Sequence, residues 1–197
     1  MKLTANITLD ELTKSQVAER KGINNNPSPE QIENLKALAV NVLQPIRSHF
    51  DKPLIISSGF RCAQLCVEIG SSVNSQHTAH DEAAAADFEI PGVDNKELAV
   101  WIRNNLEVDQ GILEFYKDGE PSSGWIHCSY SRNSNRQQWL RAMREDGKTV
   151  YKPSLSDCLK SKRIAQNEVN PERVVFTCKK VKAQTEIYMD RKKSLKY

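Results

Sequence analysis

Hydrophobic residues recur at helical spacing in two segments of the chain. In residues 28–46 they stand three and four positions apart, at Ile32, Leu35, Leu38, Ala39, Val42, Leu43 and Ile46. This spacing predicts a long helix with one apolar face that packs on a sheet. Ser28 suits the cap of this helix, Pro29 its first turn and Gln31 the capping-box position. Residues 95–106 repeat the pattern and predict a second amphipathic helix.

Shorter apolar or alternating runs predict strands between and after these helices. Four such runs end at turn residues, and they are residues 53–58, 86–90, 111–116 and 125–130. The turn-rich segment 117–124 joins the last two, which favours an antiparallel hairpin. Short helices are expected at residues 9–12, 61–69 and 137–144, and residues 174–178 are a candidate for an added strand. Together these elements predict an α+β fold, a small and mainly antiparallel sheet with helices packed on one side.

Composition and charge divide the chain into a body and a tail. With 197 residues, 39% of them hydrophobic and 27% charged, the chain is long enough for one domain of ordinary size plus an extension. Residues 159–197 contain 11 Lys and Arg against 4 Asp and Glu, whereas the rest of the chain is mildly acidic. We therefore expect a domain at 1–155 and a basic C-terminal extension at 156–197. Such an extension suits docking to another protein or an anionic surface, nucleic acid included, and a solvated charged face explains it equally well.

The start of the chain and its cysteines bear on where the protein is made. The first residues contain no apolar run, so we expect neither a signal peptide nor a membrane span. We therefore expect the protein to be made in a cytoplasm. Five cysteines without paired CxxC units favour reduced thiols over a disulfide framework. Cys62 and Cys66 stand four apart, and their spacing is more typical of a buried helix face than of a zinc pair.

The stretch of residues 75–88 carries the candidate chemistry. It brings His77, His80 and Asp87 into a short span with small residues between them. Zinc in hydrolytic sites usually takes three protein ligands and keeps its fourth position open for water. His127, in the candidate strand 125–130, is available as the ligand from elsewhere in the chain. The pattern therefore indicates a Zn²⁺ site.

Three sequence segments resemble one known family. The spacing Thr78-x-His80-x-x-Ala83-x-Ala85-x-Asp87 resembles the SxHxxGxAxD signature of the M15 zinc D-Ala-D-Ala carboxypeptidases and endopeptidases, which share a fold with the hedgehog signalling domain. Ser58-Gly59-Phe60-Arg61 resembles the SGYR segment of that family, and Trp125-Ile126-His127-Cys128-Ser129 resembles its WxHxS segment. The resemblance extends over about residues 3–155, includes phage-borne members, and implies that His80, Asp87 and His127 hold Zn²⁺.

The choice between the two neighbouring histidines stays open. The family's common SQH string is present at residues 75–77, three residues too early for the usual distance to Asp87. One alignment places three extra residues before the ligand, and the other places them between the ligand and Asp87. We prefer His80 because metal geometry tolerates little error whereas a surface loop absorbs an insertion. His77 is the alternative ligand.

Hydrolysis also needs a general base, and Glu114 is the best candidate. Neither HExxH nor ExxH precedes His127, but Glu114 stands on the preceding candidate strand, where hedgehog-like relatives also have a glutamate. Glu120, in the connecting loop, is the fallback. Arg61 is expected to grip a substrate carboxylate or a developing oxyanion, and a structural salt bridge is the rival explanation for it.

The resemblance implies a zinc metallopeptidase that cuts stem peptides of bacterial peptidoglycan. Without an export signal, the expected source is a bacteriophage, as an endolysin or as a virion-associated enzyme that opens the wall. It would be made in the cytoplasm of the bacterial host and act on the cell wall or within the virion. The alternative is a virion structural protein that retains a zinc site without catalysis. Other virion proteins are then possible partners of the extension 156–197.

Overall fold

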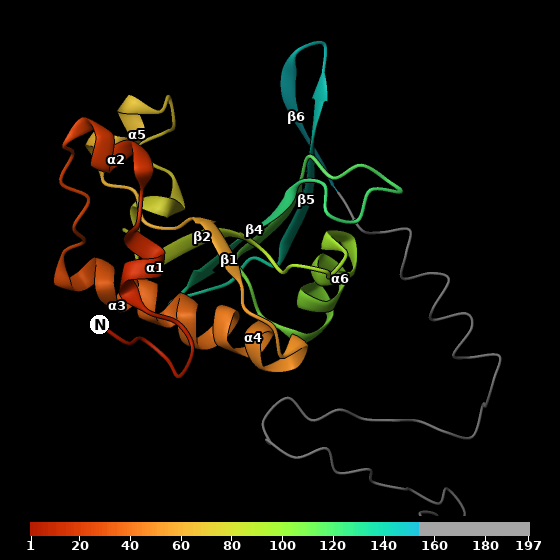
Figure 1. The fold of residues 1–197 in the computed structure, drawn as a ribbon, viewed down its shortest axis with the longest axis horizontal. Coiled ribbons are helices and arrows are strands. Elements are labelled where there is room, and N and C mark those ends of the chain that lie inside the picture. The colour runs from red at the N-terminus through yellow and green to blue at the C-terminus, as the bar shows by residue number, and fades with distance from the viewer. Residues whose placement is uncertain (154–197) are drawn as a thin grey trace, which may run out of the picture. The chain divides into compact units, whose positions relative to one another are not determined.

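The computed structural model describes residues 1–153, which form an α+β fold around one six-stranded sheet (Figure 1). The helical elements are α1 (Leu9–Thr13), α2 (Gln16–Lys21), α3 (Pro29–Leu38), η1 (Ala39–Leu43), α4 (Gln44–Phe50), α5 (Ala63–Glu68), η2 (Gln76–Thr78) and α6 (Asn95–Asn105). The strands are β1 (Ile55–Ser58), β2 (Ala83–Glu89), β3 (Gln110–Glu114), β4 (Trp125–Ser131), β5 (Gln138–Glu145) and β6 (Lys148–Pro153). The predicted extension 156–197 and the candidate strand 174–178 lie outside the described residues.

The long helix expected from the hydrophobic spacing is present as α3, η1 and α4 in succession. Ser28 and Gln31 form the predicted capping box, and Pro29 occupies the first turn. The middle segment η1 is a π-helical turn, in which the amide of Gln44 donates to the carbonyl of Ala39. Pro45 follows directly and has no N–H to donate, so a wider turn before it lets the helix continue without the missing bond.

The six-stranded sheet is mixed: most of its neighbouring pairs are antiparallel, as expected, but one pair is parallel. Its strands lie in the order β1-β2-β4-β3-β5-β6. Four neighbouring pairs are antiparallel, including the expected hairpin of β3 and β4, but β3 and β5 run parallel. The chain crosses over after β4 and enters β5 beside β3, a connection that the local pattern of hydrophobic residues does not reveal.

Residues 137–144 form strand β5 and not the expected short helix. Side chains alternate along this strand, with Trp139 packed against Gly111 of β3 so closely that a Cβ there would lie 2.5 Å from the ring. Pairing with both β3 and β6 satisfies the backbone of this segment, which overrides its weak helical pattern. Asp146 and Gly147, both with positive φ, make the two-residue turn between β5 and β6. The Asp-Gly pair is a strong hairpin signal that could have identified this pair of strands.

The two faces of the sheet differ in what they carry. On one face, Phe88 of β2, Ile126 of β4 and Leu113 of β3 are buried in the core. Helices α3 and α6 contact these strands and cover this face (Figure 1). Because side chains alternate along a strand, Asp87 and His127 point to the opposite face, which α3 and α6 leave uncovered. None of the helices in residues 1–153 combines the length and apolar character that a membrane crossing requires.

Candidate metal centre

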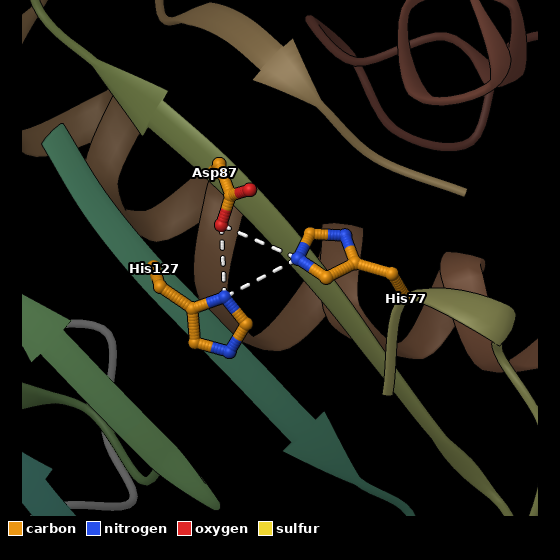
Figure 2. A group of neighbouring side chains, drawn as sticks. All are labelled: His77, Asp87 and His127. Carbon is orange, nitrogen blue, oxygen red and sulfur yellow. Dashed lines mark hydrogen bonds and ion pairs between the residues drawn. The ribbon is translucent and has the colours of Figure 1, made fainter. Parts of the chain in front are cut away.

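Three side chains converge on the uncovered face of the sheet, and they are His77, Asp87 and His127 (Figure 2). Nδ1 of His127 lies 2.8 Å from Oδ1 of Asp87, and Nε2 of His77 lies 3.3 Å from the same oxygen. The two imidazole nitrogens, His77 Nε2 and His127 Nδ1, are 3.3 Å apart. One ligand atom from each residue therefore points at a common centre.

The separations suit a small tetrahedral cation. Zinc binds nitrogen and oxygen at about 2.0–2.1 Å, so two ligands of a tetrahedral site are about 3.3 Å apart. Two of the three separations equal this value, and the shorter third one, between His127 and Asp87, is a direct hydrogen bond. Two imidazoles and one carboxylate are also a donor set that zinc accepts. The residues present thus fit a zinc ion.

Pairing of two central strands places two of these residues. Asp87 of β2 stands directly opposite His127 of β4 in the antiparallel register. Residues opposite each other share a face of the sheet, so strand pairing alone brings the carboxylate and the imidazole into contact. The run of alanines before Asp87, at residues 83–86, is buried within β2 and gives this strand close neighbours on both faces.

The third residue, His77, comes from the short helix η2, which α3 anchors. Gln31 of α3 donates to the carbonyl of Thr78 at 2.8 Å, and Asn34 donates to the carbonyl of Ala79 at 2.9 Å. Nδ1 of His77 lies 2.7 Å from the carbonyl oxygen of Gly59. That oxygen can only accept, so Nδ1 carries the proton and Nε2 presents its lone pair to the centre.

Burial sets the protonation states of the centre. His77 is only 3% exposed, and this burial lowers the pKa of its imidazole and favours the neutral form that binds metals. Burial raises the pKa of Asp87, but its contacts with the rings of His127 and His77 outweigh this and hold that pKa well below the usual range. The centre therefore combines neutral imidazole with an ionised carboxylate, the forms required of metal ligands.

The structure brings His77 into the centre and leaves His80 outside it, so the geometry favours the alternative ligand His77. The ring of His80 hydrogen bonds to Thr78 and faces Asp81, and its side chain is 39% exposed. Ala79, Asp81 and Glu82 all have positive φ, so the chain coils tightly between His77 and β2. The three extra residues are taken up there, after the ligand position, because α3 holds the backbone just after His77 in place.

Comparison with known proteins agrees with this geometry. Residues 5–129 match the family model described as Peptidase M15. The chain belongs to the peptidase M15 family. A comparison with curated proteins found no match. M15 peptidases are zinc-dependent, and the segment matched in this M15 peptidase includes the three converging residues, whereas strands β5 and β6 lie beyond its end.

Glu114 of this M15 peptidase lies beside the centre, on the same face of the sheet. It follows Ile112, which pairs with His127, by two positions along β3. Burial and the negative charge of Asp87 raise the pKa of Glu114, while His127 and Arg61 act against the shift. Glu120, the fallback base, is instead 60% exposed in the loop before β4 and pairs with Lys117 at 3.3 Å. The structure thus places only the first candidate near the three converging residues.

Arg61 contacts the far oxygen of Asp87. Its Nη2 lies 3.3 Å from Oδ2, while Nε donates to Ser58 and Nη1 donates to Ser71. This is the salt bridge that was the rival explanation for Arg61. The guanidinium leaves Oδ1 of Asp87 turned toward the histidines. Arg61 is also among the residues that line a cavity of about 590 Å³ between α1, α2 and β1.

One supporting contact was not expected from the sequence. Gln76 donates a 2.7 Å hydrogen bond to Asp109, whose carboxylate also accepts from Arg136 at 2.9 and 2.6 Å. Burial raises the pKa of Asp109, but the hydrogen bonds from Arg136 and Gln76 outweigh this and lower it. The residue before His77 is therefore tied to an ionised, buried carboxylate at the start of β3. Nothing in the sequence indicated that Gln76 and Asp109 would be partners.

Proposed function

We propose that this protein is a zinc peptidase that hydrolyses stem peptides of bacterial peptidoglycan. His77, Asp87 and His127 hold the metal, and Glu114 is the general base. The observation that carries the proposal is the position of Glu114, a carboxylate with a raised pKa on the strand next to His127 and on the same face. A purely structural metal site does not need a second carboxylate of this kind.

The chemistry divides between the metal and the side chains. When bound, zinc polarises the carbonyl of the scissile peptide bond and acidifies the attacking water. Glu114 takes the proton from that water and passes it to the leaving amine. Burial of His77 excludes water from the rear of the centre.

Arg61 acts mainly through Asp87 in this proposal. Three of its nitrogens are already engaged, with Ser58, Ser71 and Asp87, so its plane and position are fixed. Its charge helps to keep Asp87 ionised and oriented. The expected role as a clamp on a substrate carboxylate requires donors that remain on the side facing the cavity, and a test that separates the two roles is given below.

Family membership supports the substrate class. We infer a bacteriophage enzyme, made in the bacterial host and acting on the wall either as an endolysin or from the virion. The basic residues 156–197 would then serve to dock on another virion component. A virion protein with a silent zinc site is the alternative, and the presence of Glu114 beside the centre argues against it.

The test is hydrolysis of purified peptidoglycan by zinc-loaded wild-type protein and by Glu114→Gln. The wild type is expected to release new amino groups and Glu114→Gln to lose at least about a hundredfold in rate, a loss typical of a missing general base. Both proteins should contain equal zinc. Glu120→Gln is the matched control and should keep full activity. Hydrolysis by Glu114→Gln at the wild-type rate would remove Glu114 from the mechanism, and no hydrolysis by the wild type would favour the structural alternative.

A further inference from the structure

The hairpin of β5 and β6 presents a tyrosine to the metal centre. Tyr151 of β6 pairs with Ala142 of β5, and Ala142 pairs with Glu114 of β3. Paired residues share a face, so Tyr151 and Glu114 stand in one row on the face that carries the centre. This hairpin begins after residue 129, where the match to the M15 family ends, and it projects away from the helices (Figure 1).

The residue between the two is small enough for the tyrosine to reach across. Neighbouring strands are about 4.8 Å apart, so Tyr151 and Glu114 are separated by about 10 Å of backbone. Ala142 fills little of that gap and is itself fully buried beneath its neighbours. Tyr151 is 54% exposed, and within residues 1–153 its hydroxyl has no hydrogen-bond partner. An aromatic side chain with a free hydroxyl thus borders the open side of the centre.

Electrostatics agree with this placement. Partial burial and the negative charges of Glu114 and Asp87 raise the pKa of Tyr151, against the opposing charge of Arg144. The phenol therefore stays protonated at neutral pH and can donate a hydrogen bond. Arg144 of β5 lies 5.1 Å over the ring of Phe115, whose own ring is 5.3 Å from that of Trp125. These side chains form a wall next to Glu114 on the same side as Tyr151.

We propose that Tyr151 is a substrate-binding residue, whose hydroxyl donates a hydrogen bond to a backbone carbonyl of the peptide bound beside Glu114. The inference rests on the proposed function. An extended peptide that runs from the centre toward β5 and β6 passes over the position of the small, buried Ala142 and meets Tyr151 as a hydrogen-bond donor beyond it. The wall of Arg144, Phe115 and Trp125 then limits where that peptide can turn.

The experiment compares Tyr151→Phe with Tyr130→Phe, each measured on soluble muropeptides. Tyr130 is a matched control because it stands on β4 but packs on the helix-covered face. Loss of one neutral hydrogen bond is expected to lower kcat/KM about three- to tenfold in Tyr151→Phe. Zinc content and Tm should not change, and Tyr130→Phe should equal the wild type. Equal kcat/KM for Tyr151→Phe and the wild type would overturn the proposal.

Binding without turnover separates this inference from the proposed activity. Calorimetry measures the Kd for muropeptides of zinc-loaded Glu114→Gln and of the double variant that also carries Tyr151→Phe. The Kd of the double variant should be higher by the same factor of about three to ten. If the wild type proves inactive, the proposed function fails. A higher Kd of the double variant would then still support a role of Tyr151 in peptide binding. If the wild type is active and the Kd is unchanged, only the role of Tyr151 is overturned. An absence of any muropeptide binding would overturn both.

Discussion

Nε2 of Gln76 donates a 2.7 Å hydrogen bond to Oδ2 of Asp109, which ties the residue before His77 to the residue before β3. Asp109 is 4% exposed and accepts two further bonds from the guanidinium of Arg136. One buried carboxylate thus connects the segment that carries a metal ligand to the strand that carries Glu114.

Replacing this carboxylate should loosen both parts of the site. Asp109→Asn removes a buried charge and one of the two oxygens that accept from Arg136 and Gln76, so we expect the free energy of unfolding to fall by about 1–3 kcal/mol. Zinc binding should weaken as well, because the residue next to His77 loses its strong acceptor. Asp118→Asn is the control, since Asp118 is 61% exposed and its pairs with Lys96 and Arg141 are worth little. Urea unfolding and zinc titration measure the two effects, and equal behaviour of the two variants would contradict this role for Asp109.

Arg61→Lys distinguishes positioning of a ligand from capture of substrate. Lysine cannot reproduce the three separate bonds to Ser58, Ser71 and Asp87. If Arg61 mainly orients Asp87, zinc affinity should fall about 10–100-fold. If Arg61 instead grips a substrate carboxylate, KM should rise while zinc affinity holds. Arg20→Lys, which lines the same cavity, is the matched control and should change neither.

The metal-free protein should reveal the raised pKa of Glu114 through its stability. The folded state binds the carboxyl proton of Glu114 more firmly than the unfolded state does, in which a glutamate has a pKa of about 4.3. Below that pH the carboxyl is protonated in both states and does not lower the free energy of unfolding. As the pH rises through the raised pKa, ionisation of the buried group destabilises the folded state. Metal-free Glu114→Gln should therefore be more stable than the wild type at pH 7 and no more stable near pH 4. Thermal unfolding across this range is the measurement, and a variant less stable at pH 7 would contradict the assigned surroundings of Glu114.

Local patterns in the sequence predicted the elements that depend on local physics. The helix after Ser28 and the hairpin of β3 and β4 were confirmed, because caps, spacing and turn residues all lie within the segment itself. Membership of the M15 family was confirmed as well. The expected convergence of Asp87 and His127 also holds, and it follows from the antiparallel pairing of their strands.

The features in which the structure differs from the expectations depend on contacts between distant segments. The parallel pairing of β3 with β5 rests on the packing of Trp139 over Gly111, two residues far apart in sequence. The preference for His80 over His77 assumed that the insertion lies before the ligand. Gln31 and Asn34 of α3 instead fix the backbone at Thr78 and Ala79, so the extra residues coil after it. No spacing within residues 75–88 reveals that anchor.

Zinc titration of His77→Ala and His80→Ala tests the proposed centre most directly. Both variants remove one imidazole from the same short segment, so each controls for the other. His80→Ala should bind one equivalent of zinc with the affinity of the wild type, because its ring faces Thr78 and Asp81. His77→Ala should lose stoichiometric zinc, because only Asp87 and His127 remain at the centre. Retention of zinc by His77→Ala together with its loss from His80→Ala would contradict the account.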